Sequence, residues 1–89
     1  MDKMEELYKV VNFIRDYRKK LNITQEQIAT KLDMSPSFIN KIENGVKIPS
    51  LTLSFLILEA MKDIYMDETG LYVDLHFEDL FLLEHLNSK

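Results

Sequence analysis

The sequence predicts an all-α domain of five helices, with a short strand near residues 71–75 as one added element. Its 89 residues are enough for one domain with one core. Two glycines and two prolines supply few of the turn residues that the hairpins of a sheet protein need. Apolar residues instead recur at spacings of three and four, which is typical of helices with one buried face. We therefore expect residues 1–89 to form a single helical domain.

The first helix is expected over residues 4–21. Its apolar stripe consists of Leu7, Val10, Val11, Ile14, Tyr17 and Leu21. Lys19 and Lys20 suit the negative end of the helix dipole, and Asn22 can adopt the left-handed conformation that ends a helix.

The second and third helices carry explicit start signals. Thr24 and Gln27 form a capping box, in which each side chain bonds the backbone amide of the other residue, and this predicts a helix over 25–32. Ser35 as N-cap and a proline at the first helical position begin a third helix that runs to residue 43 or 44. Gly45 ends this helix.

The sequence predicts several kinds of secondary structure in the C-terminal half. Ser50 caps a fourth helix from residue 51 to about 65, and a charged turn follows over 66–70. Residues 71–77 alternate apolar and polar with period two, which favours a strand, and residues 78–87 return to a helical pattern. An alternative of equal weight is that 71–75 lengthens a helix or loop.

The formal charge of −4 is divided unevenly along the chain. Residues 1–14 sum to −1, residues 15–50 to +3 and residues 51–89 to −6. A basic middle segment indicates a nucleic-acid contact. The absence of cysteine excludes disulfides and thiolate metal sites. The sequence contains neither a secretory signal pattern nor an apolar run of membrane-spanning length, so we expect a cytoplasmic protein.

Two short helices joined by a turn of about three residues must cross steeply, which is the geometry of a helix-turn-helix. The exposed face of the third helix carries Ser37, Asn40, Lys41 and Asn44, with Pro36 at its tip. Asn can pair with adenine in the major groove, Lys can donate to guanine and Ser can contact either. These residue types suit a helix that reads DNA, although a solvated polar face has a similar composition.

Four motifs of the chain occur together: Ile23-Thr24-Gln25, Ile28-Ala29, Ile39-Asn40-Lys41-Ile42-Glu43-Asn44-Gly45 and Pro49-Ser50-Leu51. Through them, residues 10–58 resemble the Cro/repressor-type helix-turn-helix family, also called XRE-like. The resemblance implies a repressor-like fold with a helix-turn-helix core over about 14–58. We expect the C-terminal part, about 62–89, to be a dimerisation extension. It implies double-stranded DNA as the partner.

The resemblance also implies roles for individual residues. Base edges are contacted at the positions of Pro36, Ser37, Asn40 and Lys41. DNA phosphates are contacted at the positions of Thr24, Gln25, Ser35, Asn44 and Lys47. Arg18 and Glu43 match residues that commonly form an ion pair between the first and third helices.

The chain departs from the family pattern in two places. Asp33 stands in the turn where the family usually has glycine, and aspartate still tolerates the left-handed conformation. A stretch over about 62–75 replaces the family's short link between the fourth and fifth helices. We expect any function beyond DNA binding to involve this stretch.

No residue pattern indicates an enzyme or a metal centre. His76 and His85 lie nine residues apart, which fits no ligand motif. The sequence has no glycine-rich phosphate loop and no nucleophile in a recognisable setting. We expect no catalytic residue, no metal and no cofactor.

The favoured function is a sequence-specific transcriptional regulator, a homodimeric repressor that reads the major groove with residues 36–44. The alternative is an antitoxin or protein-interaction adaptor on the same scaffold, whose acidic C-terminal third contacts a protein partner. Dimerisation is expected through apolar residues of the C-terminal third. Those from Leu75 onward, which include Phe77, Leu82, Leu83 and Leu86, are too many for one face of a short helix. Leu71, Val73 and Leu75 alternate with polar residues as in a strand. We hypothesise that 71–75 pairs with its counterpart across a twofold axis as a two-stranded sheet.

Overall fold

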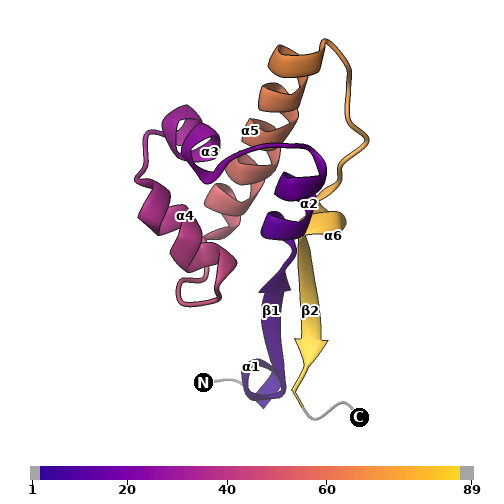
Figure 1. The fold of residues 1–89 in the computed structure, drawn as a ribbon. Helices are drawn as coiled ribbons and strands as arrows, with labels where there is room; N and C mark the ends of the chain where they lie inside the picture. The colour runs from indigo at the N-terminus through magenta and orange to yellow at the C-terminus, as the bar shows by residue number, and fades with distance from the viewer. Residues whose placement is uncertain (1–2, 87–89) are drawn as a thin grey trace.

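The computed structural model describes residues 3–86. In chain order the elements are α1 (Lys3–Leu7), β1 (Tyr8–Asn12), α2 (Ile14–Lys20), α3 (Gln25–Leu32), α4 (Pro36–Glu43), α5 (Leu51–Thr69), α6 (Phe77–Leu80) and β2 (Phe81–His85). The described part is mostly helical, with six helices instead of five and with a two-stranded antiparallel sheet that the all-α prediction lacked. Figure 1 shows the helices α2 to α6 gathered as one body, from which the two strands project as a ribbon with α1 at its far end.

The core lies between α2, α3, α4 and α5. Ile14, Ile28 and Ile42 are 0% exposed, and α5 contributes Ile57 and Met61 to the same cluster. Complete burial of an aliphatic side chain of this size contributes about 1.5 to 3 kcal/mol to folding. Of the stripe expected for the first helix, Ile14 belongs to this core, whereas Leu7 and Val10 are 37% and 45% exposed.

The helix starts agree with the predicted caps. The Thr24 hydroxyl accepts a hydrogen bond from the Gln27 amide at 3.0 Å, and the Gln27 side chain accepts from the Thr24 amide at 2.8 Å. Ser35 and Ser50 accept in the same way from the amides three residues on. The predicted capping box and both predicted serine caps are confirmed. The sequence predicts such caps well because each cap depends on residues within a single turn.

In the turn between α3 and α4, Asp33 has the left-handed conformation that aspartate tolerates. Asp33 has φ 56° and ψ 49°, and the Met34 amide donates to the carbonyl oxygen of Ala29 at 2.8 Å. Asn22 ends the preceding helical region with φ 59°. Both residues have short polar side chains, and both adopt a left-handed backbone conformation that most residues avoid.

The prediction of one helix over 4–21 was wrong, because residues 8–12 form β1. Tyr8, Val10 and Val11 are residue types that favour strands, and the partner strand lies more than sixty positions away in the sequence. Asn12 ends the strand with its side chain, whose amide nitrogen donates to the carbonyl oxygen of Ile42 at 2.8 Å and whose oxygen accepts from the Ile14 amide at 3.2 Å.

The expected turn over 66–70 was also wrong, because α5 continues to Thr69. Two contacts with α3 hold its last turns: Lys31 Nζ lies 3.6 Å from Asp67 Oδ2, and Gln27 Nε2 donates to Glu68 Oε1 at 3.2 Å. Gly70 then ends the helix with φ 73°. The helix is longer than predicted because contacts distant in sequence stabilise its end.

The strand expected at 71–75 is absent from the described structure, and 81–85, expected within a helix, forms β2. Residues 71–76 are extended without a strand partner, with Leu75 buried and Val73 packed against the core. Their period-two pattern therefore reflects one side of an extended segment that lies on the body. Of the expected final helix, residues 78–80 belong to α6, and residue 87 lies outside the described residues.

The ribbon pairs β1 with β2 in an antiparallel register that runs from Tyr8 opposite His85 to Asn12 opposite Phe81. The ladder continues at both ends, because the Phe13 amide donates to the Leu80 carbonyl at 2.8 Å and the Leu86 amide donates to the Leu7 carbonyl at 2.7 Å. The sheet is intramolecular, which corrects the hypothesis of an intermolecular pair at 71–75. None of the described helices has the length and apolarity needed to cross a membrane.

Candidate nucleic-acid interface

One face of α4 is polar and exposed. Ile39 and Ile42 point into the core and are 0% exposed. The exposed residues of this helix and its C-cap are Pro36, Ser37, Asn40, Lys41 and Asn44. All four residues expected to contact bases therefore lie on an accessible helix surface. The adjacent α3 begins close to them, since Gln25 hydrogen-bonds Asn40.

A buried carboxylate lies at the edge of this exposed face, three residues after Asn40 on α4. The Glu43 side chain is 0% exposed. Arg18 Nε donates to Glu43 Oε2 at 2.8 Å, and Arg18 Nη2 donates to Oε1 at 3.1 Å. Arg15 Nε and Gln25 Nε2 also donate to Oε1, at 3.2 and 3.0 Å. The expected pair of Arg18 and Glu43 is thus present, and four donors occupy the acceptor sites of one carboxylate.

Burial by itself raises the pKa of the Glu43 carboxyl, because it disfavours the charged form. The hydrogen bonds from Arg18, Gln25 and Arg15, together with the charge of Arg18, outweigh this effect and lower the pKa below its ordinary value of 4.5. Glu43 is therefore an ionised, acceptor-only group that joins α2, α3 and α4.

Arg15 belongs to this network and was not predicted from the sequence. Its guanidinium donates to Glu43 through Nε and to Asn44 Oδ1 through Nη2. Its side chain remains 41% exposed, so the same group also borders the polar face. The spacing of Arg15 and Arg18, three apart on one helix, was the available signal.

Gln25 is oriented toward α4. Its Nε2 donates to Asn40 Oδ1 at 3.1 Å and to Glu43 Oε1 at 3.0 Å, which uses both of its N–H groups. A phosphate accepts hydrogen bonds, so this side chain has no donor left for one while both bonds persist. The backbone amides of Gln25 and Glu26 remain available, since the first N–H groups of a helix have no intrahelical acceptor.

The other residues expected at phosphates surround the face. Thr24 and Ser35 are exposed caps at the starts of α3 and α4. Lys47 is exposed in the loop after α4, and its amide donates to the carbonyl oxygen of Lys41 at 3.2 Å. Asn44 is exposed at the C-cap. The structure thus brings all nine expected DNA-contact residues to α4 and the segments next to it.

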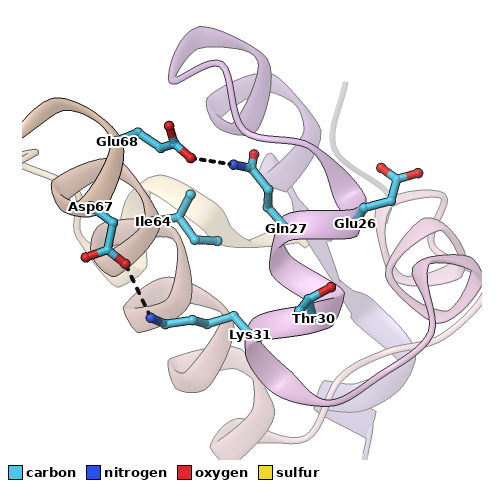
Figure 2. Close-up of a pocket in the computed structure, with 7 residues that line it drawn as sticks. All are labelled: Glu26, Gln27, Thr30, Lys31, Ile64, Asp67 and Glu68. Carbon is cyan, nitrogen blue, oxygen red and sulfur yellow. Dashed lines mark hydrogen bonds and ion pairs between the residues drawn. The ribbon is translucent and has the colours of Figure 1, made fainter.

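A separate groove of about 340 Å³ lies between α3 and the end of α5. Figure 2 shows Gln27 directed at Glu68 and Lys31 directed at Asp67 across it, with Ile64 at its base. Glu26 supplies a further acid to the lining. With three acids against one lysine, this groove repels phosphate and is unsuited to DNA.

The residues expected at a dimer interface fall into two groups. Leu75 is 3% exposed, and Val73 and Phe77 pack against the core of their own protomer. The others are exposed large apolar residues, namely Leu71, Leu82, Leu83 and Leu86. Leu75 therefore cannot supply interface surface, because burial in the protomer already covers it.

Comparisons with known proteins agree with this geometry. A family model described as helix-turn-helix matches residues 14–68. An uncharacterized HTH-type transcriptional regulator of Methanothermobacter thermautotrophicus is 32% identical over 76 residues, which cover 85% of this chain and 94% of that protein. A second protein with that description, from Methanocaldococcus jannaschii, is 39% identical over 61 residues, or 64% of this chain and 92% of its own. No solved structure matches the chain.

Proposed function

The chain belongs to the XRE-type helix-turn-helix family, and from that premise we propose that it is a sequence-specific transcriptional regulator that reads the major groove of double-stranded DNA with α4. The observation that carries the proposal is that α4 is anchored through a buried carboxylate while it keeps an exposed polar face. Glu43 is held by three side chains, whereas Ser37, Asn40 and Lys41 face solvent. A rigid helix with exposed polar groups can present them to base edges.

Phosphate contacts have separate donors around this helix. The N-terminus of α3 offers free backbone amides and the positive end of its dipole. Lys47, Arg15 and the hydroxyls of Thr24 and Ser35 lie nearby and are at least partly exposed. The segment 15–50, which contains all of them, carries +3 of charge, and the acidic groups concentrate in 51–89, which carries −6.

A homodimer is part of the proposal, because two linked half-sites give the affinity that one small module lacks. An apolar surface suited to this lies beside the end of α4, and we call it the ribbon patch: Val10, Ile48, Leu51 and Leu83. These side chains are 45%, 72%, 69% and 59% exposed. Val10 and Leu83 are cross-strand partners, and all four line one groove of about 470 Å³.

A second copy of the chain is the occupant that fits this patch. The four residues carry no charge, so a partner with the same apolar surface is complementary to it. Large exposed apolar patches are uncommon on monomeric proteins. The patch includes the loop that follows α4, so a twofold axis there would place two copies of α4 near each other. Two half-sites on one face of DNA are about 34 to 36 Å apart.

We propose repression as the regulatory effect, since a dimer on two adjacent half-sites occludes the DNA that it covers. The alternative is an antitoxin or adaptor in which the same apolar patch and the acidic C-terminal third contact another protein. The two functions differ in whether the isolated protein discriminates between DNA sequences.

Replacing Asn40 with alanine is expected to lower affinity for the preferred duplex by about 1 to 3 kcal/mol and to relax the preference at one base pair. Lys47→Ala is the matched control, because loss of a phosphate contact should weaken all duplexes alike and make the salt dependence shallower. Fluorescence anisotropy with single-base variants of the duplex measures both effects. Equal losses on every duplex for Asn40→Ala would show that α4 is not the reading helix.

The function itself is tested by selecting bound sequences from a random duplex library. The selected duplex and a scrambled duplex of the same composition are then compared over a range of salt concentrations. We expect preference for the selected duplex and an affinity that falls steeply with salt. Failure to enrich any sequence would favour the adaptor function.

A further inference from the structure

We propose that Gln25 is a positioning residue that fixes the side-chain amide of Asn40 in the orientation that reads adenine, and that the buried carboxylate of Glu43 sets this orientation. The inference rests on the proposed function, since it concerns how the same face of α4 selects a base. It depends on a chain of hydrogen bonds in which each group determines which way the next one faces.

The chain begins at a group with one possible role. An ionised carboxylate accepts hydrogen bonds and donates none. Glu43 Oε1 lies 3.0 Å from the terminal nitrogen of Gln25. The reversed amide would place the Gln25 oxygen against the carboxylate, where two acceptors repel each other. Glu43 therefore determines the orientation of the Gln25 amide.

The second step carries this orientation to the surface. The other N–H of Gln25 Nε2 donates to Asn40 Oδ1 at 3.1 Å. If the Asn40 amide were reversed, two N–H donors would face each other, so its oxygen must lie on the side of Gln25. Asn40 keeps its second oxygen lone pair and both N–H groups for other partners.

Asn44 is held in a similar way. Arg15 donates to Glu43 through Nε and to Asn44 Oδ1 through Nη2. The carbonyl oxygens of both asparagines on this face are thus engaged by donors that Glu43 orients. This recurrence supports the view that the network organises the exposed face as well as the interior.

A fixed amide discriminates between bases better than one that can turn. The major-groove edge of adenine offers the N7 acceptor beside the N6 donor, and an asparagine amide matches it with one N–H and one oxygen lone pair. The reversed amide presents the opposite order. By excluding the reversed form before binding, Gln25 removes the cost of ordering Asn40 and raises the preference for adenine.

The test uses the full-length protein, the selected duplex and the three duplexes with other bases at the pair that Asn40→Ala identifies. Wild-type protein should prefer adenine there by about tenfold or more. Gln25→Glu keeps the size of the side chain but removes both N–H groups, and Gln25→Ala removes the amide. Either change should reduce this preference at least threefold and leave preferences at other pairs unchanged. In the Asn40→Ala background, either substitution of Gln25 should have no further effect on the base preference at that pair.

A measurement without DNA provides an independent arm. The NMR order parameter of the Asn40 side-chain amide should fall in Gln25→Ala, while thermal unfolding shows that the variant is folded. If wild-type protein selects a sequence but Gln25→Ala weakens all duplexes equally, Gln25 acts only on phosphate or stability and the positioning role is wrong. If wild-type protein selects no sequence, the proposed function fails first, and the adenine assignment falls with it.

Discussion

Glu43→Ala is expected to destabilise the protein by about 3 to 5 kcal/mol, which is the usual cost of removing one partner from a buried ion pair. Arg18 would lose its carboxylate partner while its side chain is only 12% exposed, so water cannot fully replace the lost bonds. A domain of this size has a total stability of roughly 5 to 15 kcal/mol, and the variant should be partly unfolded at 37 °C. Urea unfolding followed by circular dichroism measures the difference.

The matched control is Glu59→Ala, which removes an exposed carboxylate 3.5 Å from Lys62 and should cost less than about 1 kcal/mol. Acid provides a second check. The pKa of Glu43 is lower in the folded protein than its ordinary value of 4.5. The ionised carboxylate therefore stabilises the fold fully at any pH above the pKa of Glu43 in the unfolded chain, and this stabilisation is lost as the pH falls through the folded-state pKa. The difference in the free energy of unfolding between wild type and Glu43→Ala should therefore become smaller at low pH. A difference that is small at pH 7 would mean that the network does not anchor α4.

The double variant Val10→Lys with Leu83→Glu is expected to convert a dimer into a monomer. These residues are cross-strand partners, so the new side chains can form an ion pair and preserve the ribbon. Two charges on the ribbon patch would have to lose water at the interface. Affinity for a duplex with two half-sites should fall by about 10² to 10⁴, while affinity for one half-site should be unchanged.

Sedimentation equilibrium at several protein concentrations measures the assembly state directly. Leu71→Lys with Tyr72→Glu is the control, because these residues are 61% and 90% exposed and do not line the groove of the ribbon patch. If the control dissociates the dimer and the ribbon variant does not, the interface lies on the 71–76 segment instead. A wild-type protein that remains monomeric at micromolar concentration would contradict the dimer proposal.

The sequence was informative where structure depends on neighbouring residues. The capping box at Thr24 and the serine cap before Pro36 predicted the helices α3 and α4 to within one residue. The ribbon was not predicted, because β1 and β2 stabilise each other by pairing although they lie near opposite ends of the sequence. The apolar residues of 8–12 also fit the helical stripe of the segment that follows, and so a local pattern concealed the strand.

The candidate site was likewise predicted only in part. The resemblance supplied the positions of Asn40 and Lys41, which lie within one continuous motif, and it also implied the pair of Arg18 and Glu43. It did not supply Arg15, nor the use of both Gln25 donors within the protein. Those features depend on how three helices meet, which spacing along one helix does not determine.

Site-specific cross-linking to DNA tests directly whether α4 lies in the major groove. The chain has no cysteine, so Ser37→Cys on α4 and Thr30→Cys beside the acidic groove each introduce a single thiol. The selected duplex carries a thiol tether on one base in the major groove, and disulfide formation is measured at equilibrium under mild reducing conditions. We expect a cross-link from Ser37→Cys at one or two adjacent base positions and none from Thr30→Cys. Cross-linking from Thr30→Cys, or from Ser37→Cys at every base position alike, would contradict the claim that α4 reads the major groove.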